Sequence, residues 1–260
     1  MQNVVIRAIE RLDFRTKEAY KTLRTNLSFA GKNVKVISLT SCTPNEGKTS
    51  VSFQLCLSLA ESGKQTILVD ADLRKSVLRG RYKANREKYG LSHYLSGQVE
   101  LDDACCRTNV NNFDIIFAGP VPPNPSELLG GDAFRNMLEV LRMKYDYVIV
   151  DTPPLGSVID AAIVGAICDG TVIVVESGAI SYKFVQNVKE QLNKVNTKKN
   201  PYYGKYYGHY YGNYYGNGQD GTEEAQEDLT PDAGSKTDGT AAETKTAVPG
   251  QNTGEKESAK

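Results

Sequence analysis

Five short runs rich in β-branched and other apolar residues constrain the fold of this 260-residue chain more than any other feature. They lie at residues 34–40, 65–72, 113–119, 145–152 and 170–177. The stretches between them, such as 49–63 and 125–145, have the periodicity of helices. Strands that alternate with helices predict an α/β fold, a doubly wound and mostly parallel sheet flanked by helices. Ligands of such sheets bind beyond the carboxyl ends of the strands.

The loop after the first run reads "SCTPNEGKTS" over residues 41–50. A loop that ends in Gly-Lys-Thr before a helix directs backbone N–H groups at a polyphosphate, which Lys48 would reach, while the Thr49 hydroxyl would ligate Mg²⁺. The residues expected to contact the nucleotide are Pro44, Asn45, Glu46, Gly47, Lys48, Thr49 and Ser50. The match to this P-loop is partial because Cys42 stands where the common form has glycine. A chance Gly-Lys-Thr in a helix-capping loop is the alternative.

Three aspartates follow two of the other predicted strands. Asp70 and Asp72 come at the end of "ILVDADLR", and Asp151 ends "VIVDTPP". The carboxyl ends of these strands should meet the P-loop at one edge of the sheet. There the carboxylates could hold Mg²⁺ directly or through water, and one could accept a proton from an attacking hydroxyl. The alternative is that each aspartate only caps the following helix.

These motifs together resemble the bacterial tyrosine kinases of capsule and exopolysaccharide loci. The resemblance rests on S-x-x-P-x-x-G-K-T at residues 41–49, D-x-D-x-R after three aliphatic residues at 67–74, D-x-P-P after three aliphatic residues at 148–154, and a tyrosine-rich segment at 202–215. The stretch "GPVPPNPSELL" (119–129) is also similar to the family. The likeness covers roughly residues 14–216.

The resemblance implies an ATP-dependent protein-tyrosine kinase that phosphorylates its own tail and regulates the synthesis and export of capsular or extracellular polysaccharide. Its implied cofactors are ATP and Mg²⁺, with the metal held by Thr49, Asp72 and Asp151. The implied catalytic residues are Lys48, Asp70, Asp72 and Arg74. Among them Asp70 is favoured to orient or deprotonate the phenol.

The segment 201–216 reads "PYYGKYYGHYYGNYYG" and holds eight of the fifteen tyrosines of the chain. Glycine after each pair keeps the segment free to enter an active site, so the tyrosines are the expected phosphate acceptors. They are Tyr202, Tyr203, Tyr206, Tyr207, Tyr210, Tyr211, Tyr214 and Tyr215. A low-complexity segment that only self-associates is the alternative.

The last part of the chain, residues 217–260, carries ten Asp and Glu against four Lys and Arg and few large aliphatic side chains. It cannot bury enough apolar surface to offset the entropy of ordering, so we expect it to be disordered. The expected organisation is a P-loop kinase domain over residues 1–200, with a helical segment at about 14–30. The tyrosine cluster (201–216) and the acidic tail (217–260) follow.

A charged motif in "EAYKTLRTN" bears on assembly. Glu18, Lys21 and Arg24 lie on neighbouring turns of one helix and resemble the family's oligomerisation motif, with lysine in place of its first arginine. The resemblance implies a ring of subunits that present their tails to one another, a transmembrane adaptor that activates the kinase, and a cognate tyrosine phosphatase. A solvated charged face is the alternative.

The expected location is the cytoplasm, at the inner face of the membrane through the adaptor. Five cysteines without a C-x-x-C pair suggest neither a disulfide framework nor a zinc site, and the N-terminus has no secretory signal. Nucleic acid is not an expected partner, because no basic helix stands out. A partitioning or site-selection ATPase of the same superfamily is the alternative function, although Thr43 stands where those proteins have an additional lysine.

The chain departs from the family pattern after the helix "SYKFVQNVKEQLNKV". Family members continue to a glycine turn and one more strand, whereas here the sequence runs directly into the tyrosine repeat. Roughly a dozen residues are therefore expected to be missing near Gln191–Asn193. The loss should leave the edge of the preceding strand bare and the segment 189–202 irregular or poorly packed. The alternative is that the chain closes the sheet in a different way.

Overall fold

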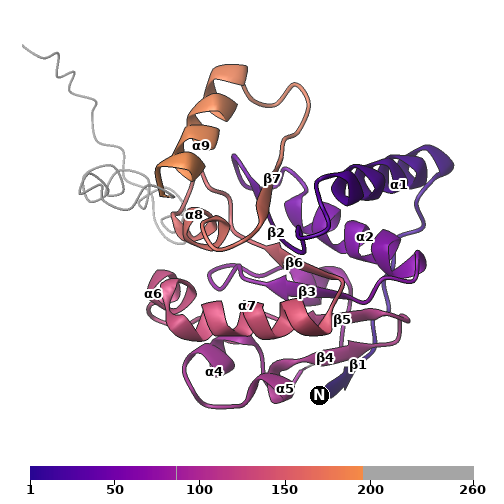
Figure 1. Ribbon diagram of the computed structural model, residues 1–260, viewed down its shortest axis with the longest axis vertical. Coiled ribbons are helices and arrows are strands. Elements are labelled where there is room, and N and C mark those ends of the chain that lie inside the picture. Colours follow the sequence, from indigo (N-terminus) through magenta and orange to yellow (C-terminus); the bar gives the residue numbers. More distant parts are fainter. Residues whose placement is uncertain (86, 196–260) are drawn as a thin grey trace, which may run out of the picture. The chain divides into compact units, whose positions relative to one another are not determined.

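The computed structural model describes residues 1–85 and 87–195. In this part of the chain seven strands form one sheet in the order β1-β4-β5-β3-β6-β2-β7 (Figure 1). The strands are β1 (Gln2–Val4), β2 (Val36–Ser41), β3 (Thr66–Asp70), β4 (Cys106–Thr108), β5 (Phe113–Ile116), β6 (Tyr147–Asp151) and β7 (Gly170–Val174). Neighbouring strands run parallel except β4 and β5, which are antiparallel. The predicted mostly parallel α/β fold is confirmed.

Helices connect these strands. They are α1 (Phe14–Phe29), α2 (Lys48–Glu61), α3 (Leu78–Arg81), α4 (Leu91–Leu95), α5 (Leu101–Ala104), α6 (Pro125–Gly130), α7 (Asp132–Lys144), α8 (Asp160–Gly165) and α9 (Tyr182–Val195). The helix predicted over 125–145 is two helices, because Gly131 adopts an extended conformation that ends α6 and precedes α7. None of the helices in the described ranges combines the length and the apolar character needed to cross a membrane.

The sheet is buried on both faces: every residue of β2 and β3 is buried, and the polar ones are Ser or Thr apart from Asp70 at the end of β3. Ile67 and Val69 of β3 pack in one core cluster with α6 and α7, whereas Leu68 packs in a second cluster with α2. Adjacent residues of a strand point to opposite faces, so one apolar run serves both layers. This arrangement explains the apolar runs Ile67–Val69 of β3 and Val148–Val150 of β6.

The loops that carry the predicted site leave the same edge of the sheet. β6 lies between β2 and β3, and Asp151 at its end is in register with Asp70 of β3 and Leu39 of β2. Because the three strands are parallel, the loops that follow Ser41, Asp70 and Asp151 begin side by side. The fold therefore brings three motifs, distant in sequence, to one edge.

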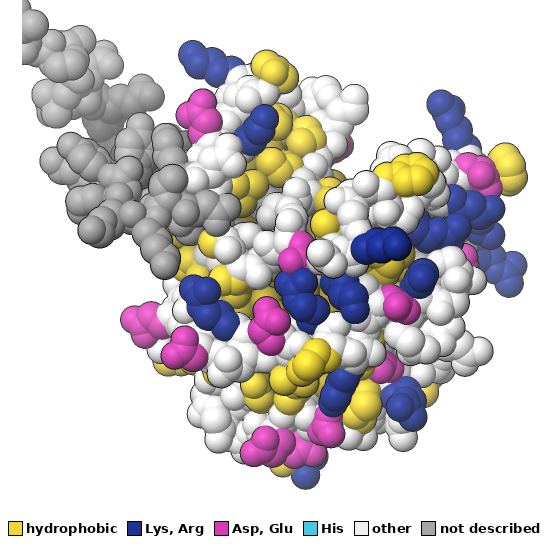
Figure 2. Space-filling view, viewed as in Figure 1, with side chains coloured by type: hydrophobic (Ala, Val, Ile, Leu, Met, Phe, Trp, Pro, Cys, Tyr) yellow, Lys and Arg dark blue, Asp and Glu magenta, His cyan; other side chains and the backbone are white. Residues whose placement is uncertain are grey.

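Strand β7 forms the edge of the sheet next to β2 within the described residues. All five of its residues are only half-buried, in contrast to the fully buried β2 and β3. Val175, directly after β7, is 40% exposed. Figure 2 shows apolar side chains open to solvent in the region where Figure 1 places α9 and β7. The expected bare edge is present in this part of the chain.

The expectation of an irregular segment from residue 189 is wrong for residues 189–195, which continue α9. The physical reason is an apolar stripe on the helix. Val188 is fully buried, and Leu192 packs in the same apolar cluster beside α8. The helix therefore has a surface to pack on without a further strand. The other residues of that expected segment, 196–202, lie outside the described residues.

Covering the edge of β7 should stabilise the chain. We expect an insertion of a glycine turn and five aliphatic residues after Val195 to raise the melting temperature by roughly 5 °C, which corresponds to about 2 kcal/mol. The inserted strand would pair with β7 and bury its half-exposed residues. Differential scanning calorimetry would measure the effect against a Gly/Ser insertion of the same length. Equal melting temperatures for the two insertions would show that the bare edge costs nothing.

Candidate active site

The loop between β2 and α2 has the backbone shape of a phosphate-binding loop. Asn45 and Gly47 both have positive φ angles, 69° and 86°. A Cβ atom added at Gly47 would meet no other atom within 4 Å, so the backbone angle and not the available space requires glycine there. The Glu46 carboxylate accepts a hydrogen bond from the Thr43 amide at 2.8 Å and closes the turn.

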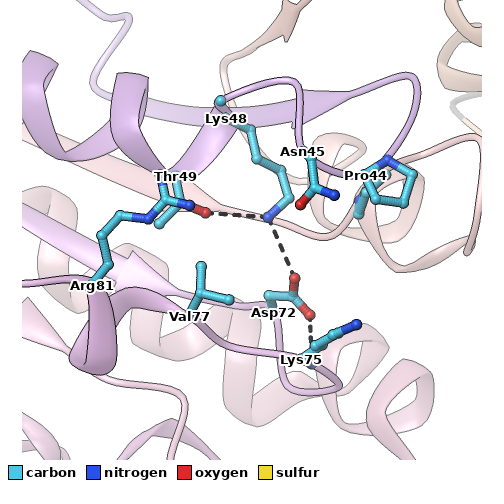
Figure 3. A pocket seen from close by; sticks show the side chains of 10 residues that line it. Pro44, Asn45, Lys48, Thr49, Asp72, Lys75, Val77 and Arg81 are labelled. Atoms are coloured by element: carbon cyan, nitrogen blue, oxygen red, sulfur yellow. Dashed lines mark hydrogen bonds and ion pairs between the residues drawn. The ribbon is translucent and has the colours of Figure 1, made fainter. Parts of the chain in front are cut away.

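Lys48 and Thr49, the first residues of α2, face the loop that follows β3 (Figure 3). The Lys48 Nζ lies 3.4 Å from the Asp72 carboxylate and 3.3 Å from the Thr49 hydroxyl. Their side chains are largely buried, with 12% of Lys48 and 5% of Asp72 exposed. The ammonium group is therefore held between the start of a helix and the end of a neighbouring strand.

The other two aspartates lie behind this contact and are fully buried. Asp70 accepts hydrogen bonds from the Ser76 hydroxyl and, at 3.3 Å, from the Asp72 amide. Asp151 accepts a hydrogen bond from Ser52 of α2 at 3.0 Å. Three carboxylates from two strands thus surround one lysine.

Burial and mutual repulsion change the proton affinity of this group. Burial, together with the charges of Asp151 and Asp72, raises the pKa of Asp70 to about 8, and Ser76 and Lys48 oppose the rise only in part. Burial also raises the pKa of Asp151. Burial would lower the pKa of Lys48, but the surrounding carboxylates outweigh it and the pKa is raised. Lys48 therefore stays charged while Asp70 holds its proton up to mildly alkaline pH.

A polar pocket of about 110 Å³ opens at this point. Five of the residues predicted to contact a nucleotide line it, namely Pro44, Asn45, Gly47, Lys48 and Thr49. Two do not. Glu46 turns back to Thr43, and Ser50 accepts a hydrogen bond from Arg81. Asp72 and Pro154 complete the pocket from the second and third motifs.

Lys75, Val77 and Arg81 also line this pocket and are not among the residues predicted from the motifs. The amide of Lys75 donates to the Asp72 carboxylate at 2.9 Å, which fixes the loop after β3. The only signal in the sequence was the excess of basic residues shortly after the D-x-D-x-R motif. Asp70, predicted to act on the phenol, and Asp151 do not line the pocket themselves.

The Arg74 side chain does not line the P-loop pocket but forms a structural contact with α6 and α8. Its guanidinium binds Asp160 of α8 at 2.6 and 3.0 Å and donates to Ser126 of α6 at 2.8 Å. Only 10% of the Arg74 side chain and none of the Asp160 side chain is exposed. The structure therefore places this predicted catalytic residue where it joins α6 and α8 to the end of β3.

Breaking that buried ion pair should destabilise the fold. We expect Asp160→Asn to cost about 3 kcal/mol because it removes the carboxylate that binds the buried Arg74 guanidinium through two hydrogen bonds, and to lower the melting temperature by roughly 6–12 °C. The control is Asp102→Asn, which breaks an exposed pair with Lys144 of similar length, 3.2 Å. Exposed pairs contribute at most about 1 kcal/mol. If both variants melt together, the Arg74 contact contributes no more than a surface pair.

The three residues of the predicted oligomerisation motif lie on α1. Lys21 pairs with Glu18 at 2.7 Å, and both side chains are about half exposed. Arg24 instead donates to the Ser58 carbonyl oxygen of α2 at 2.6 Å, which anchors α1 on the domain. Glu18 and Lys21 are the members of the motif that remain at the surface. The predicted acceptor tyrosines, Tyr202–Tyr215, lie outside the described residues.

The pocket has the chemistry that a nucleotide phosphate and its metal require. A charged lysine and a loop of backbone N–H groups before a helix suit phosphate oxygens. No group of three His, Cys, Asp or Glu poised to hold a metal occurs among the described residues. Mg²⁺ does not need one, because it binds through one or two carboxylates while phosphates and water supply the remaining ligands. Thr49 and Asp72, two of the three predicted metal ligands, line the pocket.

The fold and the loop together define a P-loop nucleotide-binding protein. Comparison with known proteins identifies the family to which it belongs. A family model described as an AAA domain matches residues 34–203. Tyrosine-protein kinase CpsD of Streptococcus agalactiae is 44% identical over 184 residues, which make up 71% of this chain and 80% of that protein. CpsD of Streptococcus pneumoniae serotype 4 is 41% identical over 189 residues, or 72% of this chain and 83% of that protein.

A solved structure agrees with these relatives. The kinase domain of the Escherichia coli tyrosine kinase ETK has a TM-score of 0.67 and 33% identity, covering 75% of this chain and 86% of that domain. The chain belongs to the family of bacterial tyrosine-protein kinases. The family inferred from the motifs is thereby confirmed, and these relatives do not favour the partitioning ATPase.

Proposed function

We propose that this chain transfers the γ-phosphoryl group of ATP to tyrosine hydroxyls, and that its acceptors are the tyrosines of its own segment 201–216. The observation that supports this most strongly is the contact between Lys48 and Asp72 at the mouth of the P-loop pocket. This contact joins the start of α2, which would bind phosphate, to the loop after β3 that carries the D-x-D-x-R motif. The membership of the tyrosine-kinase family supports the choice of acceptor.

In the proposed reaction the tyrosyl oxygen attacks the γ-phosphorus, the bond to the ADP oxygen breaks with its electron pair, and the phenolic proton passes to Asp70. Ser76 connects the two, since its hydroxyl donates to the buried Asp70. Lys48 stabilises the charge that develops on the phosphate oxygens. Thr49 and Asp72, with Asp151 behind them, would hold Mg²⁺. When bound, the metal would supply further neutralisation of the phosphate charge.

The remaining proposals follow the family. Residues 1–200 would be the kinase domain, 201–216 the acceptor cluster and 217–260 an acidic tail. A ring of subunits formed through Glu18 and Lys21 would present each cluster to a neighbouring site. A transmembrane adaptor would activate the enzyme at the inner face of the membrane, and a tyrosine phosphatase would reverse the reaction. The biological role would be control of capsular or extracellular polysaccharide synthesis.

The test is incubation of the full chain with Mg²⁺ and γ-labelled ATP, followed by phosphoamino-acid analysis. We expect the label on tyrosine, and its loss when all eight clustered tyrosines are replaced by phenylalanine. Release of labelled inorganic phosphate with no protein label would indicate the ATPase instead. Label that persists in the phenylalanine variant would place the acceptors elsewhere.

A further inference from the structure

A second cavity opens beside the P-loop pocket and is much larger, about 690 Å³. The two cavities share Val77 and Arg81 as lining residues, so they adjoin each other. Val77, one of the two shared residues, is 41% exposed. Ser76, whose hydroxyl donates to Asp70, also lines the second cavity. The cavity therefore lies on the side of the site from which an acceptor would approach Asp70.

Basic side chains surround this cavity. Arg79, Arg81, Lys88 and His93 line it, and Glu87 is the acidic residue among its described lining. Glu87 is 90% buried and lies 3.9 Å from Arg79, which is half exposed and reaches the rim. Nδ1 of His93 accepts a hydrogen bond from the Gly90 amide at 3.1 Å, which leaves Nε2 as a donor. The described lining of the cavity thus carries an excess of positive charge, with three cationic side chains, Arg79, Arg81 and Lys88, against Glu87.

Aromatic and apolar surface completes the cavity. The Tyr89 ring is in its wall, with Lys88 over it at 4.8 Å from its centroid, whereas the Phe117 side chain is buried in the core behind the cavity. The volume is within the range of pockets that enclose small ligands. Two simpler ligands use only part of this lining: a neutral phenol would not use the cationic side chains, and inorganic phosphate would not use the aromatic ring. An aryl phosphate uses both, since arginine and lysine bind its phosphate and the Tyr89 ring can pack on its phenyl group.

We propose that this cavity binds phosphotyrosine from the segment 201–216, so that a tail phosphorylated once is retained for further phosphorylation. This inference rests on the proposed function for the source of the ligand. The repeat places the next tyrosine pair four residues away, within about 14 Å along an extended chain. Binding of one phosphotyrosine would keep that pair at a high effective concentration next to the P-loop pocket. Later phosphates would then be added faster than the first.

The binding test uses the full chain without nucleotide. The probes are the peptide of residues 201–208 phosphorylated on Tyr202, the same peptide unphosphorylated, and inorganic phosphate. We expect the phosphopeptide to bind at least about 10-fold more tightly than either of the others. Arg79→Gln with Lys88→Gln should weaken the phosphopeptide at least about 10-fold and leave the affinity for Mg²⁺-ATP unchanged. Lys88→Gln alone, which removes an exposed side chain, should weaken it in part.

Charge-matched control variants are Lys32→Gln with Arg135→Gln, both exposed and outside the cavity. Equal weakening by this control, or equal affinity for all three probes, would overturn the inference. A second readout is the number of phosphates per chain over time. The cavity variant should accumulate singly phosphorylated chains that the wild type does not. Because the peptide assay needs no phosphoryl transfer, it can fail while the kinase is active, and it can succeed in an inactive enzyme.

Discussion

Replacing Lys48 by methionine is expected to reduce the labelling of tyrosine by γ-labelled ATP at least about 100-fold, because the variant loses the cation that faces the transferred phosphate. The ammonium group lies at the mouth of the pocket, and the surrounding carboxylates raise its pKa and keep it charged. Methionine has a similar length and no charge. The loss should therefore appear in the transfer rate. Labelling and an ATP-binding titration on the same preparation would measure it.

Lys64→Met is the matched control. Lys64 is exposed and follows the other end of α2, so its replacement changes the same residue type outside the site. It should label at the wild-type rate. Circular dichroism would establish that both variants are folded. A folded Lys48→Met protein that labels like the control would exclude this lysine from the chemistry.

Replacing Asp70 by asparagine should have two large and opposite effects. Phosphorylation should fall by about 10²–10⁴-fold, the usual contribution of a positioned general base. The neutral amide can still accept from the Asp72 amide and donate to Ser76, so the geometry should be kept. In the wild type the free-enzyme rate should rise with pH up to about 8, where Asp70 loses its proton. Initial rates between pH 6 and 9 would record both results.

The same substitution should stabilise the metal-free protein. Folding raises the pKa of Asp70 from 3.8 to about 8, so the folded state binds more protons than the unfolded state between these values. Wild-type stability should therefore fall as the pH rises from about 4 to 8. Asp70→Asn removes that loss and should melt several degrees higher at pH 8 in EDTA. The control is Asp103→Asn at the surface. An unchanged melting temperature in Asp70→Asn would mean that folding does not raise the pKa of Asp70.

Five strands (β2, β3, β5, β6 and β7) could be predicted from the sequence because each is a short run rich in β-branched and other apolar residues. β1 and β4 contain three residues each and leave no periodic pattern. The prediction for the end of α9 was wrong because Val188 and Leu192 pack beside α8. This is a tertiary contact, and the prediction rested only on the length of the sequence relative to the family pattern.

In the site, too, residues that belong to motifs could be predicted, whereas contacts that depend on tertiary packing could not. Lys48, Thr49 and Asp72 could be placed together because motif spacing and strand order determine where they lie. The partner of Arg74 could not, since Asp160 is 86 positions away and only the packing of α8 brings them into contact. The second cavity is assembled from loops and two short helices, whose residues carry no recognisable spacing.

The most direct measurement of the proposed function is the mass of the intact chain before and after incubation with Mg²⁺ and ATP, with peptide mapping of the product. We predict mass increments of one phosphate each, up to eight, that map to the tyrosines of segment 201–216 and are absent in Lys48→Met. An unmodified segment, in a preparation that binds or hydrolyses ATP, would contradict the assignment of this chain as a kinase of its own tail.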